Sequence, residues 1–190
     1  MSKVLVFSGA NGTGKTTLAK SILEHNIQFI NADDIKKTEN LSYIEAGQKS
    51  LKMIDLCISQ NKDFSFETTM SGKGLLKRFE YLKKEQYRIT IYYLFAYPIE
   101  LLLERIKERV KKGGHFVSDI DVERRYRRSI QNFWTCYRFF ADEWTIINNN
   151  ELEPKNIVAG NKKELYIIDN SEFDVFKEVL RNKKILTLIF

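Results

Sequence analysis

The sequence predicts an α/β fold, with one domain over residues 1–190 built on a doubly wound, mainly parallel sheet of five strands. Three observations predict this class. Short apolar runs alternate with longer amphipathic runs, and the first apolar run leads directly into a glycine-rich turn. The composition, with 43% hydrophobic and 29% charged residues, is that of an ordinary globular chain.

The N-terminal elements follow from their residue patterns. The apolar run KVLVFS makes residues 3–8 the first strand, and KTTLAKSILEH makes 15–25 a helix. IQFIN at 27–31 is the second strand and leads into the acidic NADD. Apolar residues near one face predict a helix over 42–60, and DFSFET at 63–68 is the third strand.

The middle of the chain continues the alternation. GLLKRFEYLKKEQ at 74–86 is a helix and RITIYYLFA at 88–96 is the fourth strand. IELLLERIKERVKK at 99–112 is a strongly periodic helix, which GGHFVSD at 113–119 ends with two glycines. An apolar stripe in steps of three and four predicts one further helix over about 120–141.

The end of the chain is less regular. EWTIINNN at 143–150 is the fifth strand. Residues 151–190 are expected to form a small C-terminal appendage, with a hairpin over 156–168 and a helix from about 172 to 184.

The glycine-rich turn SGANGTGKTT carries the clearest chemistry. Gly9, Gly14, Lys15 and Thr16 fit G-x-x-x-x-G-K-[ST], the phosphate-binding loop of P-loop NTPases. In that motif backbone N–H groups cradle phosphates, the lysine reaches the β/γ-phosphates and the hydroxyl ligates Mg²⁺. The alternative is an ordinary turn that happens to contain lysine. The motif predicts a nucleotide site with Thr16 on Mg²⁺, Lys15 in a catalytic role, and the loop Gly9, Ala10, Asn11, Gly12, Thr13, Gly14, Lys15, Thr16 and Thr17.

Carboxylates follow the second and third strands. In such sheets ligands bind beyond the C-terminal ends of the strands, where Asp33, Asp34, Glu67 and Thr68 are expected. One carboxylate could accept a proton from an attacking hydroxyl, and the other could hold Mg²⁺ through water or bind the acceptor. The alternatives are a helix N-cap for Asp33 or Asp34 and an exposed strand-end acid for Glu67.

Residues 105–128 resemble a lid in layout. Nine basic and four acidic residues there account for most of the net charge of +6. Arg105 and Arg109 are four residues apart on one helix, as are Arg124 and Arg128 on the next. Two such helices joined by glycines could close over phosphates and stabilise a transferring phosphoryl group. The alternative is a solvated basic face.

Other features exclude several classes. The longest apolar run, at 91–99, is too short to span a bilayer, and no signal peptide is evident, so we expect a cytoplasmic protein without a membrane partner. Cys57 and Cys136 match no metal or redox spacing.

His115 lies in the lid turn, where it either contacts phosphate or is exposed. The basic segment has no recognised nucleic-acid motif beside it, so nucleic acid is not the expected ligand.

Taken together, GANGTGKTT, FINADDI, SFETTMSG, RVKKGGHFVSD, RRYRRS and NFW resemble the zeta-toxin-like kinases, and more closely their bacterial branch of zeta-toxin-type or predicted ATPases. The resemblance runs from about residue 3 to residue 150. It implies a P-loop kinase fold that uses ATP and Mg²⁺. It also implies transfer of the γ-phosphate to a small-molecule hydroxyl, which in zeta toxins belongs to UDP-N-acetylglucosamine.

The resemblance also implies roles for residues. By motif position Asp33 resembles the general base, Glu67 the acceptor-binding acid and Arg109 the first lid arginine. The toxin lid is shorter, so Arg124, Arg125 and Arg128 stay open as the second catalytic arginine. Toxins of this family are often held inactive by an antitoxin, which is therefore a compatible partner. The candidate acceptor-binding residues are Glu67, Thr68, His115 and Arg125.

Two other functions remain compatible with the motifs. One is a P-loop ATPase that needs no small-molecule acceptor. MSGKG at 70–74 faintly resembles an ABC signature, yet it follows the third strand directly and no hhhhDE run comes after it. The other is a nucleic-acid end kinase, which the basic segment would serve.

Overall fold

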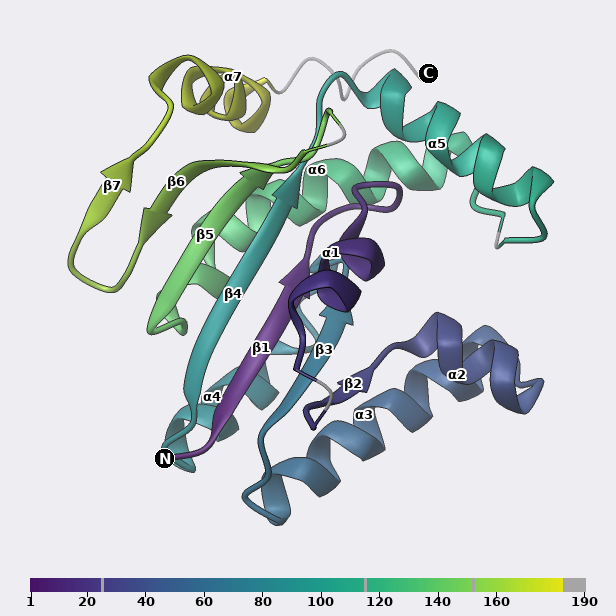
Figure 1. Cartoon of the computed structure of the whole chain (residues 1–190), viewed down its shortest axis with the longest axis vertical. Helices are drawn as coiled ribbons and strands as arrows, with labels where there is room; N and C mark the ends of the chain where they lie inside the picture. Colours follow the sequence, from purple (N-terminus) through teal and green to yellow (C-terminus); the bar gives the residue numbers. More distant parts are fainter. Residues whose placement is uncertain (25, 115, 152, 183–190) are drawn as a thin grey trace.

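The structure is a computed structural model that describes residues 1–24, 26–114, 116–151 and 153–182. Helices and strands alternate in it, as predicted (Figure 1). The strands are β1 Lys3–Ser8, β2 Gln28–Ile30, β3 Phe64–Thr68, β4 Arg88–Phe95, β5 Glu143–Asn148, β6 Lys155–Gly160 and β7 Leu165–Ile167. The helices are α1 Lys15–Ile22, α2 Ala32–Glu39, α3 Tyr43–Ser59, α4 Leu76–Lys84, α5 Ile99–Lys111, α6 Asp119–Thr135 and α7 Asn170–Arg181, with a 3₁₀ turn at Tyr137–Phe139.

The strands form one sheet in the order β2-β3-β1-β4-β5-β6-β7. The first five strands pair in parallel, and β6 and β7 are antiparallel. Strand β1 therefore lies near the centre, between β3 and β4, and its C-terminal end carries the glycine-rich turn. Figure 1 shows α1 in front of the sheet and α6 behind it, which is the doubly wound arrangement that the sequence predicts.

The predicted count of five strands is wrong, because the hairpin extends the same sheet. Strand β6 pairs with β5 from Trp144↔Gly160 to Asn148↔Lys155. Without it β5 would be an edge strand with a row of unpaired backbone groups. Gly160 permits the close approach, since a Cβ there would lie 2.5 Å from Cζ2 of Trp144.

The predicted helix over 120–141 also ends early, at Thr135. The Arg138 guanidinium lies 4.0 Å from the ring centre of Trp134, and its Nε donates to the Trp134 carbonyl at 2.6 Å. A cationic side chain thus satisfies a carbonyl that the helix leaves without an intrahelical partner. The chain then turns into the short 3₁₀ segment.

Alternating residues of the central strands form the core face beneath α6. Val4 and Val6 of β1 lie beside Ile89 and Ile91 of β4, and all four are fully buried. The Tyr93 ring, one pair further along, stacks on Phe133 of α6 at 4.1 Å. This packing holds α6 against the sheet and so fixes one of the two helices of the predicted lid. Among the described helices none is long and apolar enough to cross a membrane.

We expect Phe133→Ala to lower the free energy of unfolding by about 3–5 kcal/mol, because it leaves a cavity between α6 and β4. Phe139→Ala is the matched control, since that ring is 56% exposed, and should lower it by less than about 1 kcal/mol. Urea unfolding followed by circular dichroism measures both. Equal losses in the two variants would contradict this packing.

Candidate active site

In the loop after β1, both glycines of the G-x-x-x-x-G-K-[ST] motif have a backbone conformation that other residues adopt only with strain. Gly9 has φ +137° and Gly14 has φ +88°. A Cβ at Gly9 would overlap the Leu94 carbonyl oxygen of β4, and one at Gly14 would overlap the amide of Asn149. The motif glycines are therefore required by both conformation and close packing.

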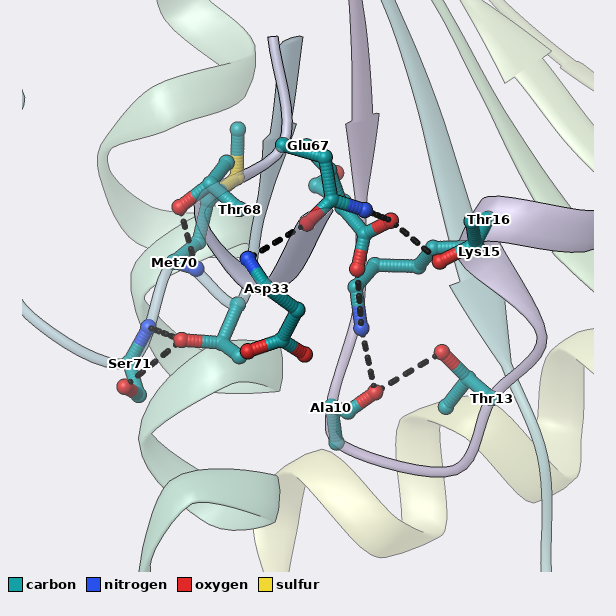
Figure 2. Close-up of polar contacts among 12 residues, drawn as sticks. Ala10, Thr13, Lys15, Thr16, Asp33, Glu67, Thr68, Met70 and Ser71 are labelled. Atoms are coloured by element: carbon teal, nitrogen blue, oxygen red, sulfur yellow. Dashed lines mark hydrogen bonds and ion pairs between the residues drawn. The ribbon is translucent and has the colours of Figure 1, made fainter. Parts of the chain in front are cut away.

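The loop closes on the carbonyl oxygen of Ala10. The hydroxyl of Thr13 donates to it at 2.9 Å, and Lys15 Nζ donates at 2.8 Å (Figure 2). Asn149, just after β5, supports the loop from outside, because its Nδ2 donates to the Thr13 carbonyl at 2.8 Å. Helix α1 begins at Lys15, so its unpaired N–H groups face the loop and favour an anion there.

Glu67, near the end of β3, lies beside this loop. Its Oε2 accepts from the Thr16 hydroxyl at 2.6 Å and from Asn31 Nδ2 at 3.0 Å. Its Oε1 is 3.6 Å from Lys15 Nζ, and the two side chains are only 14% and 6% exposed. Glu67 is therefore not an exposed strand-end acid. Burial lowers the pKa of Lys15, and the charges of Glu67 and then Asp33 oppose that effect.

Asn31 caps α2 and so places Asp33. The Asn31 Oδ1 accepts from the backbone N–H of Asp33 at 2.8 Å and of Asp34 at 3.4 Å. Neither aspartate is the cap, which was the alternative considered for both. Asp33 stands one residue into the helix and faces the loop, where Figure 2 shows it with Lys15 and Glu67.

A cavity of about 780 Å³ joins these groups, and we call it the inner cavity. Its wall includes part of the phosphate loop together with Asp33, Glu67 and Thr68. A second, outer cavity of about 1200 Å³ shares Thr16, Asp33 and Arg109 with it. Asp34 lines only the outer cavity and not the inner one. Asp33 therefore stands between the phosphate loop and a space large enough for a second small molecule.

The lid arginines take different positions. Arg109 of α5 and Arg125 of α6 line the inner cavity. Arg124 pairs with Asp121 on the exposed side of α6, and Arg128 is exposed as well; neither is among the described residues that line the two cavities. Arg105 reaches the cavity wall but is held by the carbonyls of residues 149 and 150, at 2.7 and 2.9 Å.

Of the remaining predicted residues, Asn11, Gly12 and Thr17 line the inner cavity, whereas Gly9, Ala10 and Thr13 are buried beneath it. His115 lies outside the described residues. Sequence reasoning missed Asn31 and Asn149, which hold the site from two sides. The run of three asparagines at the end of β5 was a usable signal for Asn149, because this run stands where the strand-end rule places ligand-binding residues.

A protein family described as an AAA domain matches residues 4–131, which is more than half of the chain. The chain belongs to this AAA-domain family. The match runs from β1 into α6, so the AAA domain includes the phosphate loop, Asp33, Glu67 and the three described arginines that line the inner cavity. An uncharacterized protein of Haemophilus influenzae is 34% identical over 131 residues, which are 66% of this chain and 93% of the relative.

Solved structures share the fold of this AAA domain at low identity. A chain of the AvrRxo1-ORF1:-ORF2 complex with ATP is 13% identical with a TM-score of 0.77, over 96% of this chain and 65% of that one. The chain thus spans 65% of the length of that solved protein. A chain of the Streptococcus pneumoniae PezAT toxin-antitoxin system is 13% identical with a TM-score of 0.57, over 98% of this chain and 88% of that one.

A kinase shares the fold as well. The shikimate kinase of Bacteroides thetaiotaomicron is 18% identical with a TM-score of 0.51, over 80% of this chain and 89% of that one. The AAA domain described here therefore has a P-loop kinase-like fold.

We expect Gly14→Ala to lower the free energy of unfolding by about 1–3 kcal/mol, because alanine is strained at this φ and meets Asn149. ATP affinity measured by calorimetry should fall as well, since the loop can no longer hold its shape. Gly47→Ala in α3 is the matched control: a Cβ there meets no atom within 4 Å, so stability should rise by about 0.5–1 kcal/mol. Unchanged stability and ATP binding in Gly14→Ala would contradict the loop geometry.

Proposed function

We propose that the chain is an ATP-dependent phosphotransferase of zeta-toxin type, which moves the γ-phosphate to a hydroxyl of a small molecule such as a UDP-N-acetyl sugar. The observation that carries the proposal is the position of Asp33. This carboxylate lines the cavity that contains the phosphate loop and also the larger outer cavity. An ATPase without a small-molecule acceptor would not need a general base that faces a cavity for a second ligand.

The nucleotide side is built from the loop. Backbone N–H groups at the start of α1 would hold the phosphates, and Lys15 would turn from the Ala10 carbonyl toward the β/γ-phosphates. Burial lowers the pKa of Lys15 and so disfavours its charged form. The negative charge of a bound phosphate would stabilise the buried ammonium.

The site also has donors that suit Mg²⁺. The Thr16 hydroxyl and the Glu67 carboxylate meet at 2.6 Å, and both are hard oxygen donors of the kind this ion prefers. When bound, the ion would neutralise charge on the β- and γ-phosphate oxygens. We therefore propose that Glu67 helps to hold Mg²⁺ beside the nucleotide. The resemblance to zeta-toxin-like kinases instead implies that Glu67 binds the acceptor.

The acceptor side is the outer cavity. There Asp33 would accept the proton of the attacking hydroxyl as the phosphoryl group arrives. Arg109 and Arg125 line the inner cavity from α5 and α6, and Arg109 also lines the outer one. Both would stabilise the charge that spreads over the transferring group. Thr68 lines the inner cavity beside Glu67, so it would contact only the reacting end of the acceptor, which extends from the outer cavity toward the phosphate loop.

The comparisons support a partner as well. Both the AvrRxo1-ORF1:-ORF2 complex and the PezAT system contain a second protein by name. We propose that this chain too is controlled by an antitoxin-like protein, and that it acts in the cytoplasm, where its ATP would come from.

We expect Asp33→Asn to slow phosphotransfer by about 10²–10⁴-fold, because the variant keeps the shape of the side chain and loses its basicity. Mass spectrometry of products from ATP, Mg²⁺ and a panel of UDP-sugars and nucleosides identifies the acceptor and gives the rate. ATP affinity should stay within a few-fold. Asp34→Asn, in the outer cavity only, is the matched control: it can change the affinity for the acceptor but should keep most of the rate at saturating acceptor. The base assignment fails if Asp33→Asn transfers phosphate as fast as the parent.

We expect Arg109→Ala and Arg125→Ala to lower turnover by as much as about 10³-fold with a smaller loss of ATP affinity, since these contacts mature in the transition state. Arg128→Ala is the matched control from the exposed side of α6 and should lose little. Steady-state kinetics separates the two effects. Equal turnover in all three variants would show that the lid arginines form only a solvated basic face.

A further inference from the structure

Asn31 is a buried polar side chain that uses both ends of its amide within the site. It is 5% exposed and stands between β2 and α2. Its Oδ1 accepts from the N–H groups of Asp33 and Asp34, and its Nδ2 donates to Glu67 Oε2 at 3.0 Å. Serine, threonine or aspartate would cap the helix equally well. Aspartate has no donor for a carboxylate, and a serine or threonine hydroxyl would have to accept and donate through one oxygen on a shorter side chain. The amide does both through two separate atoms, Oδ1 and Nδ2.

The donation to Glu67 differs from the other contacts of that carboxylate. Thr16 and Lys15 also contact it, at 2.6 and 3.6 Å. Both of these groups face the nucleotide, so a bound nucleotide and its cation would draw them away from Glu67. Asn31 also lines both cavities, but its amide already bonds at both ends, Oδ1 with the N–H groups of α2 and Nδ2 with Glu67. The phosphate-loop motif assigns it neither a phosphate nor the cation. It is therefore the described donor that keeps its hold on Glu67 when the site is filled.

We propose that Asn31 is a positioning residue that ties Glu67, on the nucleotide and Mg²⁺ side, to the first turn of the helix that carries Asp33. One side chain thereby sets the spacing between the two carboxylates of the site. Asn31 acts through Glu67 and Asp33 and touches no reacting atom itself. This inference rests on the proposed function, because it takes Glu67 to serve the Mg²⁺ side.

The competing explanation is a helix cap and nothing more. Asn31→Asp and Asn31→Ser separate the two roles, since both keep a capping oxygen and lose the Nδ2 donor. Aspartate has no donor to replace it, and the serine hydroxyl sits on a shorter side chain, so it is further from Glu67 when it caps the helix. Asn31→Asp also places a second carboxylate beside Glu67, and like charges at that distance repel. The matched control is Asp169→Ser at the N-cap of α7, where Asp169 accepts from the N–H of Glu172 at 3.0 Å.

The experiment measures ATP affinity by calorimetry twice for each variant, once with Mg²⁺ and once with EDTA, together with the melting temperature. The readout is the gain in affinity that Mg²⁺ gives. We expect that gain to fall by about tenfold in Asn31→Ser, as for loss of a hydrogen bond to a charged group, and further in Asn31→Asp. Affinity in EDTA should stay within about threefold in both, and Asp169→Ser should keep the full Mg²⁺ gain.

The outcomes are distinct. If Asn31→Ser melts as the parent does and keeps the full Mg²⁺ gain, Asn31 is only a cap and the inference is overturned. If Asn31→Asp fails to fold, Asn31→Ser still decides. If the parent binds ATP with no Mg²⁺ gain, the proposed Mg²⁺ site fails and the positioning role fails with it. If the parent binds no ATP at all, the proposed function itself is wrong.

Discussion

The buried contact between Lys15 and Glu67 is the constraint on which the rest of the site depends. A charged lysine that is 6% exposed would be costly without a counter-charge, and Glu67 supplies one at 3.6 Å. The parallel pairing of β1 with β3 brings the two together, because Phe7 lies opposite Glu67 in the register and the loop follows directly. Glu67 in turn accepts hydrogen bonds from the Thr16 hydroxyl and from the Asn31 amide.

Residues at the end of β5, together with α7, support the phosphate loop from the side of β1 opposite to β3. Asn148, at the end of β5, donates to Glu172 of α7 at 2.6 Å. The next residue, Asn149, donates to the phosphate loop, and its carbonyl accepts from Arg105 of α5. Two consecutive residues at the end of β5 therefore link α7, the phosphate loop and α5 through their hydrogen bonds. Residues outside the matched AAA domain thus contribute to holding its central loop.

The parts of the site that the sequence could predict are those set by short motifs and by strand ends. The loop, Asp33 and Glu67 are of this kind, because a parallel sheet brings the ends of neighbouring strands to one edge. The cap of α2 could not be predicted from NADD, since three of its four residues, Asn31, Asp33 and Asp34, are good caps. Which of them caps the helix depends on where the helix begins, and the structure places its first residue at Ala32. The choice between Arg124 and Arg125 depends on a rotation of about 100° around α6, which its packing on β4 determines. The sequence predicts β6 and β7 only as a separate hairpin. That β5 would otherwise be an edge strand, which β6 can pair with, follows only from the strand order of the sheet.

The measurement that tests the account most directly is a crystal structure of the chain with Mg²⁺ and a non-hydrolysable ATP analogue. The account predicts phosphates within the loop from Gly9 to Thr16, Lys15 Nζ on the β/γ-phosphates, and the ion beside Thr16 and Glu67. It also predicts Asp33 near the γ-phosphate, facing the outer cavity. A nucleotide bound elsewhere, or an ion held without Thr16 and Glu67, would contradict it.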